Sequence, residues 1–309
     1  MKHLICLKDI SKEEILQLVN KAVNIKRNPS DYSTILKDKT LLMIFEKPSL
    51  RTRVSFETGM TRMGGHAIYY NTSTSPMGKK ESIADTVKAA SRYVDIIMAR
   101  LFSHRSMEEM AQHSDVPVIN GLTDFSHPCQ ILSDLQTILE KKGKLVGLKI
   151  AYLGNSNNNV THSIMYGCLK VGMNVSIGCP SGTEYEPLPS VVEECKRICL
   201  ESGSTLTITH NAMEAVRDAD VIYTDSWMSY HIPENQKEER LRIFQPFQVN
   251  AYLMSHAKSN AIFMNCLPAM RGYEQTAEVI DGPQSVVFDQ AENRLHMQNA
   301  ILLKLLGFF

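Results

Sequence analysis

Residues 45–57, FEKPSLRTRVSFE, concentrate anion-binding groups at a point where a strand should give way to a helix. A helix start exposes backbone N–H groups and the positive end of the helix dipole. Ser49 and Thr52 add hydroxyl groups, and Arg51 adds a planar fork that matches phosphate oxygens. The stretch is therefore either an anion site or a capped helix start whose arginines are solvated.

Other polar side chains follow predicted strands in the same way. Ligands of open α/β sheets bind beyond the carboxyl ends of the strands, so these positions are candidates for one site in each half of the chain. The candidates, each at or after a predicted strand, are Lys80, Arg100, His127, Gln130, Asn159, Asp225, Ser229, Cys266, Leu267 and Arg294.

His127 and Gln130, in the segment HPCQ, lie at a predicted helix start. The helix dipole disfavours a protonated imidazole there, so a neutral His127 could donate a hydrogen bond to a carbonyl oxygen. Gln130 would lie on the same face of the helix. A purely capping role for these residues is the alternative.

Asn157, Asn158 and Asn159 occupy the position of a dinucleotide-binding loop, in the stretch YLGNSNNNVTHS. The G-x-G-x-x-G spacing is missing, and no acidic residue ends the next strand to hold a ribose. The asparagines therefore indicate either hydrogen bonds to a small polar ligand or a turn with a helix cap.

Asp225 and Cys266 each allow two interpretations. Asp225 could pair with an ammonium group or cap the following segment. Cys266 has no histidine next to it in sequence to activate the thiol, which argues against a covalent nucleophile and favours a core cysteine.

Composition restricts the class of protein. The 309 residues carry no formal net charge, which argues against a partner that is bound through bulk charge, whether a nucleic acid or an anionic membrane. The seven cysteines form no C-x-x-C pair, and the N-terminus has no apolar run of signal-peptide length. No stretch approaches the roughly 20 apolar residues of a membrane span. We expect a cytoplasmic protein with reduced thiols.

Strands and helices alternate in both halves, which predicts an α/β protein with two doubly wound parallel-sheet domains and the active site in the cleft between them. The first domain is predicted to cover residues 1–142 and the second 143–309, with the helix at about 290–309 packing back on the first. Predicted strands cover 41–45, 67–71, 96–100, 116–120, 149–153, 174–178, 205–209, 220–224, 261–265 and 285–289.

These motifs together resemble the aspartate/ornithine carbamoyltransferase family, and most closely its ornithine-specific branch. FEKPSLRTRVSFE is similar to the family's F-E-x-x-S-T-R-T-R-x-S-F-E, and HPCQ to its H-P-x-Q. DSWMS is similar to D-x-W-x-S, NCLP to H-C-L-P, and FDQAENRLH to F-[DE]-x-A-E-N-R. The five motifs occur in the family's order along essentially the whole chain.

The resemblance implies transfer of a carbamoyl group from carbamoyl phosphate to the δ-amine of L-ornithine, a step of arginine biosynthesis. It implies a carbamoyl phosphate site made by Ser49, Leu50, Arg51, Thr52, Arg100, His127, Gln130, Cys266, Leu267 and Arg294. Of these, Arg51, Arg100, His127, Cys266 and Arg294 would be catalytic. The ornithine site would comprise Asn159, Asp225, Ser229 and Tyr230.

The resemblance further implies a homotrimer, or a multiple of trimers, with no metal and no organic cofactor. Lys80 would lie in a loop that reaches toward the site of a neighbouring subunit. The chain departs from the family pattern in four places. Leu50 replaces a threonine, Pro76 a glutamine and Asn265 a histidine, while Tyr230-His231 replace Met-Gly. The changes at 230–231 and 265 fall where the amine substrate is expected.

Three alternative functions are compatible with the sequence. The chain could carbamoylate another amine such as putrescine, to which Tyr230 and Asn265 point. It could be a weakly active paralogue that binds carbamoyl phosphate, given the four departures. A nicotinamide-dependent dehydrogenase would share the α/β alternation, although the dinucleotide glycines and the ribose acid are missing.

Overall fold

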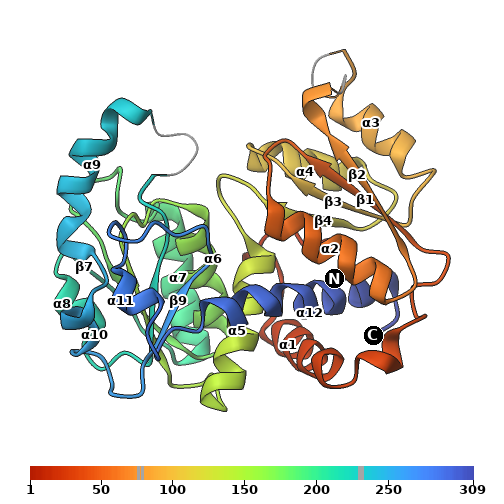
Figure 1. Ribbon diagram of the computed structural model, residues 1–309. Coiled ribbons are helices and arrows are strands. Elements are labelled where there is room, and N and C mark those ends of the chain that lie inside the picture. Colours follow the sequence, from red (N-terminus) through yellow and green to blue (C-terminus); the bar gives the residue numbers. More distant parts are fainter. Residues whose placement is uncertain (75–76, 78–79, 229–232) are drawn as a thin grey trace. The chain divides into compact units, whose positions relative to one another are not determined.

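The computed structural model describes residues 1–74, 77, 80–228 and 233–309. Within these residues the chain divides into two compact units, both visible in Figure 1. The first unit comprises 1–136 together with 292–309, and the second unit comprises 137–291. No helix in the described part of the chain is long and apolar enough to cross a membrane.

The first unit contains a parallel sheet with the strand order β2-β1-β3-β4. The register pairs Phe45 with Asn71 on one side and with Arg100 on the other, so the carboxyl ends of three strands lie level. The strands are β1 (Thr40–Phe45), β2 (His66–Asn71), β3 (Ile96–Arg100) and β4 (Val118–Leu122). The helices are α1 (Lys12–Arg27), α2 (Leu50–Arg62), α3 (Ile83–Ala90), α4 (His104–His113), the start of α5 (Pro128–Lys142) and most of α12 (Val287–Leu306).

Several helix boundaries follow from the local sequence. Ser11 caps α1 and forms a capping box with Glu14. Helix α2 is followed by Gly64 at a φ of 81°, a left-handed conformation that costs glycine little. Pro128 is the first residue of α5, where its missing N–H leaves no donor unsatisfied.

The strand predicted at 285–289 is wrong. Ser285 makes only an isolated bridge to Phe263, and the chain enters helix α12 at Val287. The run SVVFD resembles a buried strand because it is apolar and β-branched over a few residues, whereas the helical period emerges only over the following turns. Arg294 therefore lies within a helix and not beyond a strand.

Helix α12 runs alongside α1 and α2 in the first unit (Figure 1). Lys26 of α1 donates to Asn293 (2.8 Å), and Lys304 of α12 donates to Gln17 (2.9 Å). Gly59 of α2 allows the close approach, because a Cβ at this position would overlap the side-chain amide of Asn299. This packing brings α12 against α2, the helix that begins within the segment 45–57.

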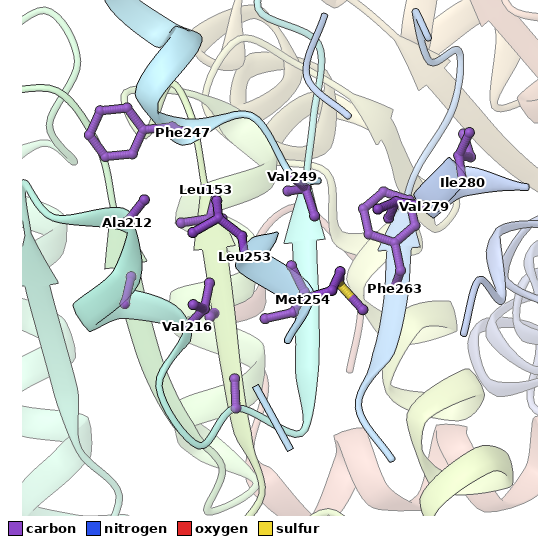
Figure 2. Packing of buried hydrophobic residues seen from close by; sticks show 14 of the residues in the cluster. Leu153, Ala212, Val216, Phe247, Val249, Leu253, Met254, Phe263, Val279 and Ile280 are labelled. Carbon is purple, nitrogen blue, oxygen red and sulfur yellow. The ribbon is translucent and has the colours of Figure 1, made fainter. Parts of the chain in front are cut away.

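The second unit contains a parallel sheet with the strand order β7-β6-β5-β8-β9. A hydrophobic core joins this sheet to helices α8, α10 and α11, and Figure 2 shows Leu153, Val216, Leu253, Phe263 and Val279 within it. The strands are β5 (Lys149–Leu153), β6 (Asn174–Gly178), β7 (Leu206–Thr209), β8 (Val221–Thr224) and β9 (Ile262–Asn265). The helices are the remainder of α5, α6 (Asn159–Lys170), α7 (Pro189–Ser202), α8 (Ala212–Val216), α9 (Lys237–Phe244), α10 (Ala251–Met254), α11 (Ala277–Ile280) and the first turn of α12.

Candidate active site

The order of strands in the first unit reverses between β1 and β3. From β1 the chain moves outward to β2 and then crosses back to β3 and β4. Such a topological switch point opens a crevice beyond the strand ends, where ligands of open α/β sheets bind. Residues 49–52 follow β1 and Arg100 ends β3, so both flank this point.

Ser49 is the N-cap of α2, and its hydroxyl oxygen accepts a hydrogen bond from the Thr52 amide (3.3 Å). The capping interpretation of this motif is therefore correct, and it leaves the anion interpretation intact. The Ser49 hydroxyl hydrogen and the first N–H groups of α2 are still able to donate to an anion. Leu50 projects outward with 74% of its surface exposed, so its contribution here is the backbone N–H.

The arginines of α2 have different environments. Arg53 pairs with Glu57 (3.2 Å) and stacks over the Tyr69 ring (3.8 Å to the centroid). Arg62 is exposed in the last turn. Arg51 is half-buried in the first turn, and the described part of the chain gives it no ion-pair partner. Arg51 is thus the arginine of this helix that is placed to meet an anion.

Arg294 of α12 is buried against the start of α2. Its Nη1 donates to Oε1 of Gln130 (2.6 Å) and its Nη2 to Oγ1 of Thr52 (3.3 Å). In the amide orientation that satisfies both groups, Gln298 accepts from Nη2 (2.9 Å) and Nε (3.2 Å) of Arg294. Because Thr52 accepts from Arg294, its hydroxyl hydrogen points elsewhere and can serve a ligand.

His127 immediately precedes α5 and is buried beside Arg100 and Arg294. Burial lowers the pKa of His127 well below its usual value, and the two arginines lower it further. The imidazole is therefore neutral at physiological pH, as the helix-start argument predicted. Gln130 lies three residues on, and its amide nitrogen donates to Asp134 (2.8 Å) while one amide hydrogen remains.

Lys47 is a buried cation of this region that the sequence did not single out. Its Nζ lies over the Phe102 ring, 4.3 Å from the centroid. Burial, reinforced by Arg100, lowers the pKa of Lys47 to about 8. Burial is the larger cause for both Lys47 and His127, and Arg100 lowers the pKa of each as well, so positively charged side chains lie close together at this sheet edge. In the sequence, Lys47 is marked only by its position two residues before Ser49, the N-cap of α2.

The second unit has its own switch point, between β5 and β8. Residues 155–159 follow β5, and Asp225 follows β8. Asn158 caps α6 by accepting from the Thr161 amide (2.8 Å), so the helix-cap interpretation holds for this asparagine. Asn159 is the first residue of α6 and is half-buried.

Tyr152, near the end of β5, holds the turn of residues 155–158 in place, and the sequence did not single it out. Its hydroxyl donates to the Asn155 carbonyl (2.9 Å) and accepts from the Asn158 amide (3.0 Å). Burial raises the pKa of Tyr152, and the neighbouring Asp225 and Cys266 raise it further. The turn after β5 and the loops after β8 and β9 therefore lie close together.

Asp225 and Cys266 are in contact, which sequence spacing could not show. The Cys266 thiol donates to Oδ1 of Asp225 (3.2 Å), and the Ser226 amide donates to the same oxygen (2.8 Å). Burial raises the pKa of Asp225, while these two donors act in the opposite direction. A partly buried carboxylate of this kind is a natural partner for a substrate ammonium group.

Glu274 is a second buried carboxyl group in this part of the second unit, and the sequence did not single it out. Its Oε1 accepts from the Met270 amide (2.7 Å). Burial raises the pKa of Glu274 to about 7, and repulsion from Asp225 adds to the effect. The group therefore titrates near neutral pH.

Replacing Glu274 with glutamine is expected to change how stability depends on pH. The folded pKa lies above the unfolded value of 4.5, so the stability carried by the protonated form is complete below about pH 4.5. That stability is lost as the pH rises through about 7, at a cost of up to about 3 kcal/mol. The melting temperature of Glu274→Gln relative to wild type should therefore rise between pH 5 and pH 8. Glu278→Gln, at an exposed position nearby, should show no such trend; parallel pH profiles for Glu274→Gln and wild type would contradict the assignment.

Three predicted residues remain outside these two clusters. Ser229 and Tyr230 lie outside the described residues, and so do two other departures from the family pattern, Pro76 and His231. Lys80 is described and exposed, next to a short bridge between Met77 and Glu81.

Comparison with known protein families gives two matches that cover most of the chain. Residues 2–140 match the carbamoyl-P binding domain of aspartate/ornithine carbamoyltransferase. Residues 146–305 match the Asp/Orn binding domain of the same family.

Individual relatives are similar along their whole length. The ornithine carbamoyltransferase of Bacillus subtilis is 52% identical over 305 residues, which are 99% of this chain and 94% of the relative. That of Thermococcus kodakarensis is 50% identical over 308 residues, covering 99% and 96%. The solved structure of ornithine carbamoyltransferase from Pyrococcus furiosus superposes with a TM-score of 0.95 at 49% identity, covering 100% of this chain and 98% of that one.

Proposed function

Because the chain belongs to the aspartate/ornithine carbamoyltransferase family, we propose that it transfers the carbamoyl group of carbamoyl phosphate to the δ-amine of L-ornithine, forming L-citrulline and phosphate. Relatives named for this reaction that are 50% and 52% identical over 99% of this chain support the assignment. The structural observation that carries it is the set of donors around the start of α2, where Arg51 lies in the first helical turn, Arg294 donates to Thr52 and Arg100 ends the neighbouring strand.

Carbamoyl phosphate is proposed to bind in the first unit. Its phosphate would accept from the hydroxyls of Ser49 and Thr52, the first N–H groups of α2 and the Arg51 guanidinium. Its carbonyl oxygen would face Arg100 and the neutral imidazole of His127. Arg294 would orient Thr52 and Gln130 while it adds positive charge. Gln130 would offer its remaining amide hydrogen.

Ornithine is proposed to bind in the second unit. Asp225 would pair with the α-ammonium group, and Asn159 would bind the amino-acid end of the substrate. Cys266 and the backbone of Leu267 would lie near the reacting carbon, and the thiol would act as a hydrogen-bond donor, consistent with its bond to Asp225. The contacts of Ser229 and Tyr230 with ornithine stay predictions.

The chemistry requires positioning and charge stabilisation. The uncharged δ-nitrogen of ornithine attacks the carbonyl carbon, so a C–N bond forms and negative charge builds on the carbonyl oxygen. The bond from that carbon to the phosphate oxygen then breaks, phosphate leaves with the electron pair, and the nitrogen loses a proton. Fixed donors stabilise the charge on the carbonyl oxygen and on the leaving phosphate. Holding both substrates together removes much of the entropic barrier.

We further propose a cytoplasmic homotrimer, or a multiple of trimers, in which the loop containing Lys80 serves a neighbouring subunit. Sedimentation velocity would test the assembly. A monomer at micromolar concentration would contradict it, and an unchanged ornithine KM in Lys80→Ala would contradict the role of the loop.

A panel of amines tests the substrate. With carbamoyl phosphate present, ornithine should give citrulline at a rate well above that with putrescine, aspartate or lysine. Preferential carbamoylation of putrescine would overturn the ornithine assignment and leave carbamoyl transfer in place. Binding of carbamoyl phosphate by calorimetry, with no turnover of any amine, would instead indicate a binding paralogue.

A further inference from the structure

A buried network of side-chain amides surrounds Asn265, the residue that stands in place of the histidine of the H-C-L-P motif. Oδ1 of Asn265 accepts from the Leu267 amide (2.8 Å), and Nδ2 donates to Oε1 of Gln275 (3.0 Å). The backbone N–H of Asn265 donates to Oε1 of Gln290 (3.0 Å), and Gln290 donates to the Tyr223 hydroxyl (3.1 Å). Asn265, Gln275 and Gln290 are all at most 1% exposed.

Asn265 therefore does not meet the amine substrate directly. Its side chain is fully buried, and both polar atoms are engaged by other residues of the loop. The sequence led us to expect this substitution at the substrate surface. The structure buries it completely, and its side-chain oxygen accepts from the backbone N–H of Leu267.

Leu267 needs such support because its φ is 56°, in the left-handed region that a residue with a branched side chain rarely adopts. Conformations of this kind persist where surrounding contacts enforce them, and they cluster at functional sites. The bond from the Leu267 amide to Asn265 is one such contact. It also occupies the N–H, which leaves the carbonyl oxygen as the polar backbone group of Leu267 that a substrate can meet.

The rest of the loop is tied to the same network. Gln275 donates to the Met270 carbonyl (3.1 Å), and Glu274 accepts from the Met270 amide (2.7 Å). Gln275 thus links Asn265 to the far side of the loop 266–275, so loosening either amide should let the Leu267 backbone relax.

We propose that Asn265 and Gln275 form a positioning pair that holds the Leu267 backbone for carbamoyl transfer, and that the pair replaces a single histidine. In both asparagine and histidine the atom bonded to Cγ, Oδ1 or Nδ1, can accept the Leu267 N–H. The side chain of asparagine does not extend as far as the Nε2 atom of a histidine. The long side chain of Gln275 spans the remaining distance and accepts from Nδ2 of Asn265. The proposal rests on the proposed function, because Leu267 is assigned to the reacting centre there.

The test compares kcat and KM for citrulline formation in wild type, Asn265→Leu, Gln275→Ala and Asn265→His/Gln275→Ala. Asn265→Leu keeps the approximate shape and removes both hydrogen bonds, so kcat should fall roughly 10- to 100-fold. The affinity for carbamoyl phosphate, measured by calorimetry, should fall by a smaller factor than kcat, because the proposed phosphate contacts of the first unit stay in place. Gln275→Ala should also lower kcat, by a smaller factor than Asn265→Leu does. In the double variant the imidazole has room, and it should recover most of the activity that Gln275→Ala loses.

Asn174→Leu is the matched control. Oδ1 of Asn174 also accepts from a loop amide, that of Thr205 (3.0 Å), but at the amino-terminal start of β6. A loss of kcat in Asn265→Leu that Asn174→Leu does not share, together with rescue by histidine, would support positioning. Equal kcat losses in the two variants, or no rescue, would reduce Asn265 to a general stability role and overturn the proposal.

The wild-type rate distinguishes a failure of the positioning pair from a failure of the proposed function. A wild-type chain that makes citrulline while folded Asn265→Leu matches its kcat would overturn the positioning pair alone. A wild-type chain that carbamoylates no amine would overturn the proposed function and the positioning pair with it.

Discussion

Arg51→Ala is expected to lower kcat/KM for carbamoyl phosphate by about three orders of magnitude. A charge-assisted, bidentate contact to phosphate is lost, and with it part of the stabilisation of the leaving group. The KM for carbamoyl phosphate should rise and kcat should fall, since phosphate gains charge in the transition state. The change should not unfold the protein, because Arg51 is half-buried and has no ion pair within the described residues.

Arg62→Ala is the matched control for Arg51→Ala. It removes the same side chain from the same helix, but from the exposed last turn. Steady-state kinetics should be close to wild type for Arg62→Ala, and thermal melts should show both variants folded. Near-normal kinetics in Arg51→Ala would refute the phosphate assignment. Equal losses in both variants would point to the net charge of α2 and not to a specific contact.

Asp225→Asn is expected to raise the KM for ornithine by about 10- to 100-fold, with a smaller effect on kcat. The substitution keeps the shape of the side chain and an oxygen that accepts from Ser226 and Cys266, so the loop should stay in place. What disappears is the negative charge that faces the proposed ammonium group, and hydrogen bonds to charged groups contribute about 1.5–3 kcal/mol. The KM for carbamoyl phosphate should stay within about twofold of wild type.

Asp218→Asn controls for Asp225→Asn. Asp218 is exposed and has a φ of 56°, a conformation that asparagine tolerates well. Its kinetics should match those of wild type with ornithine and with every other amine in the panel. An unchanged ornithine KM in Asp225→Asn would remove Asp225 from substrate binding. An equally large increase in the KM for carbamoyl phosphate would contradict a specific role of Asp225 in binding ornithine.

Much of the architecture was accessible from the sequence because its signals are local. A buried strand, a turn residue and a capped helix each depend on a few neighbouring side chains, as the capping box of Ser11 and Glu14 and the position of Pro128 illustrate. The same locality explains the error at 285–289. A short apolar run is compatible with either a strand or a helix, and here the chain enters helix α12 at Val287, whose side chain packs in the core of the second unit.

The expectation that reactive groups gather at the strand ends needs no coordinates, because parallel strands that alternate with helices must carry their loops to common edges. The sequence supplied Arg51, Arg100, His127 and Asp225 as candidates at those edges, and the structure places each of them there.

Which groups pair, which are buried and which remain for a ligand became clear from the folded chain alone. Arg53 pairs with Glu57 while Arg51 does not, and Lys47 is buried with a lowered pKa. Asn265 lies behind the proposed substrate surface, held by Gln275. Pairing and desolvation depend on distances between residues far apart in the chain, and a linear sequence does not contain those distances.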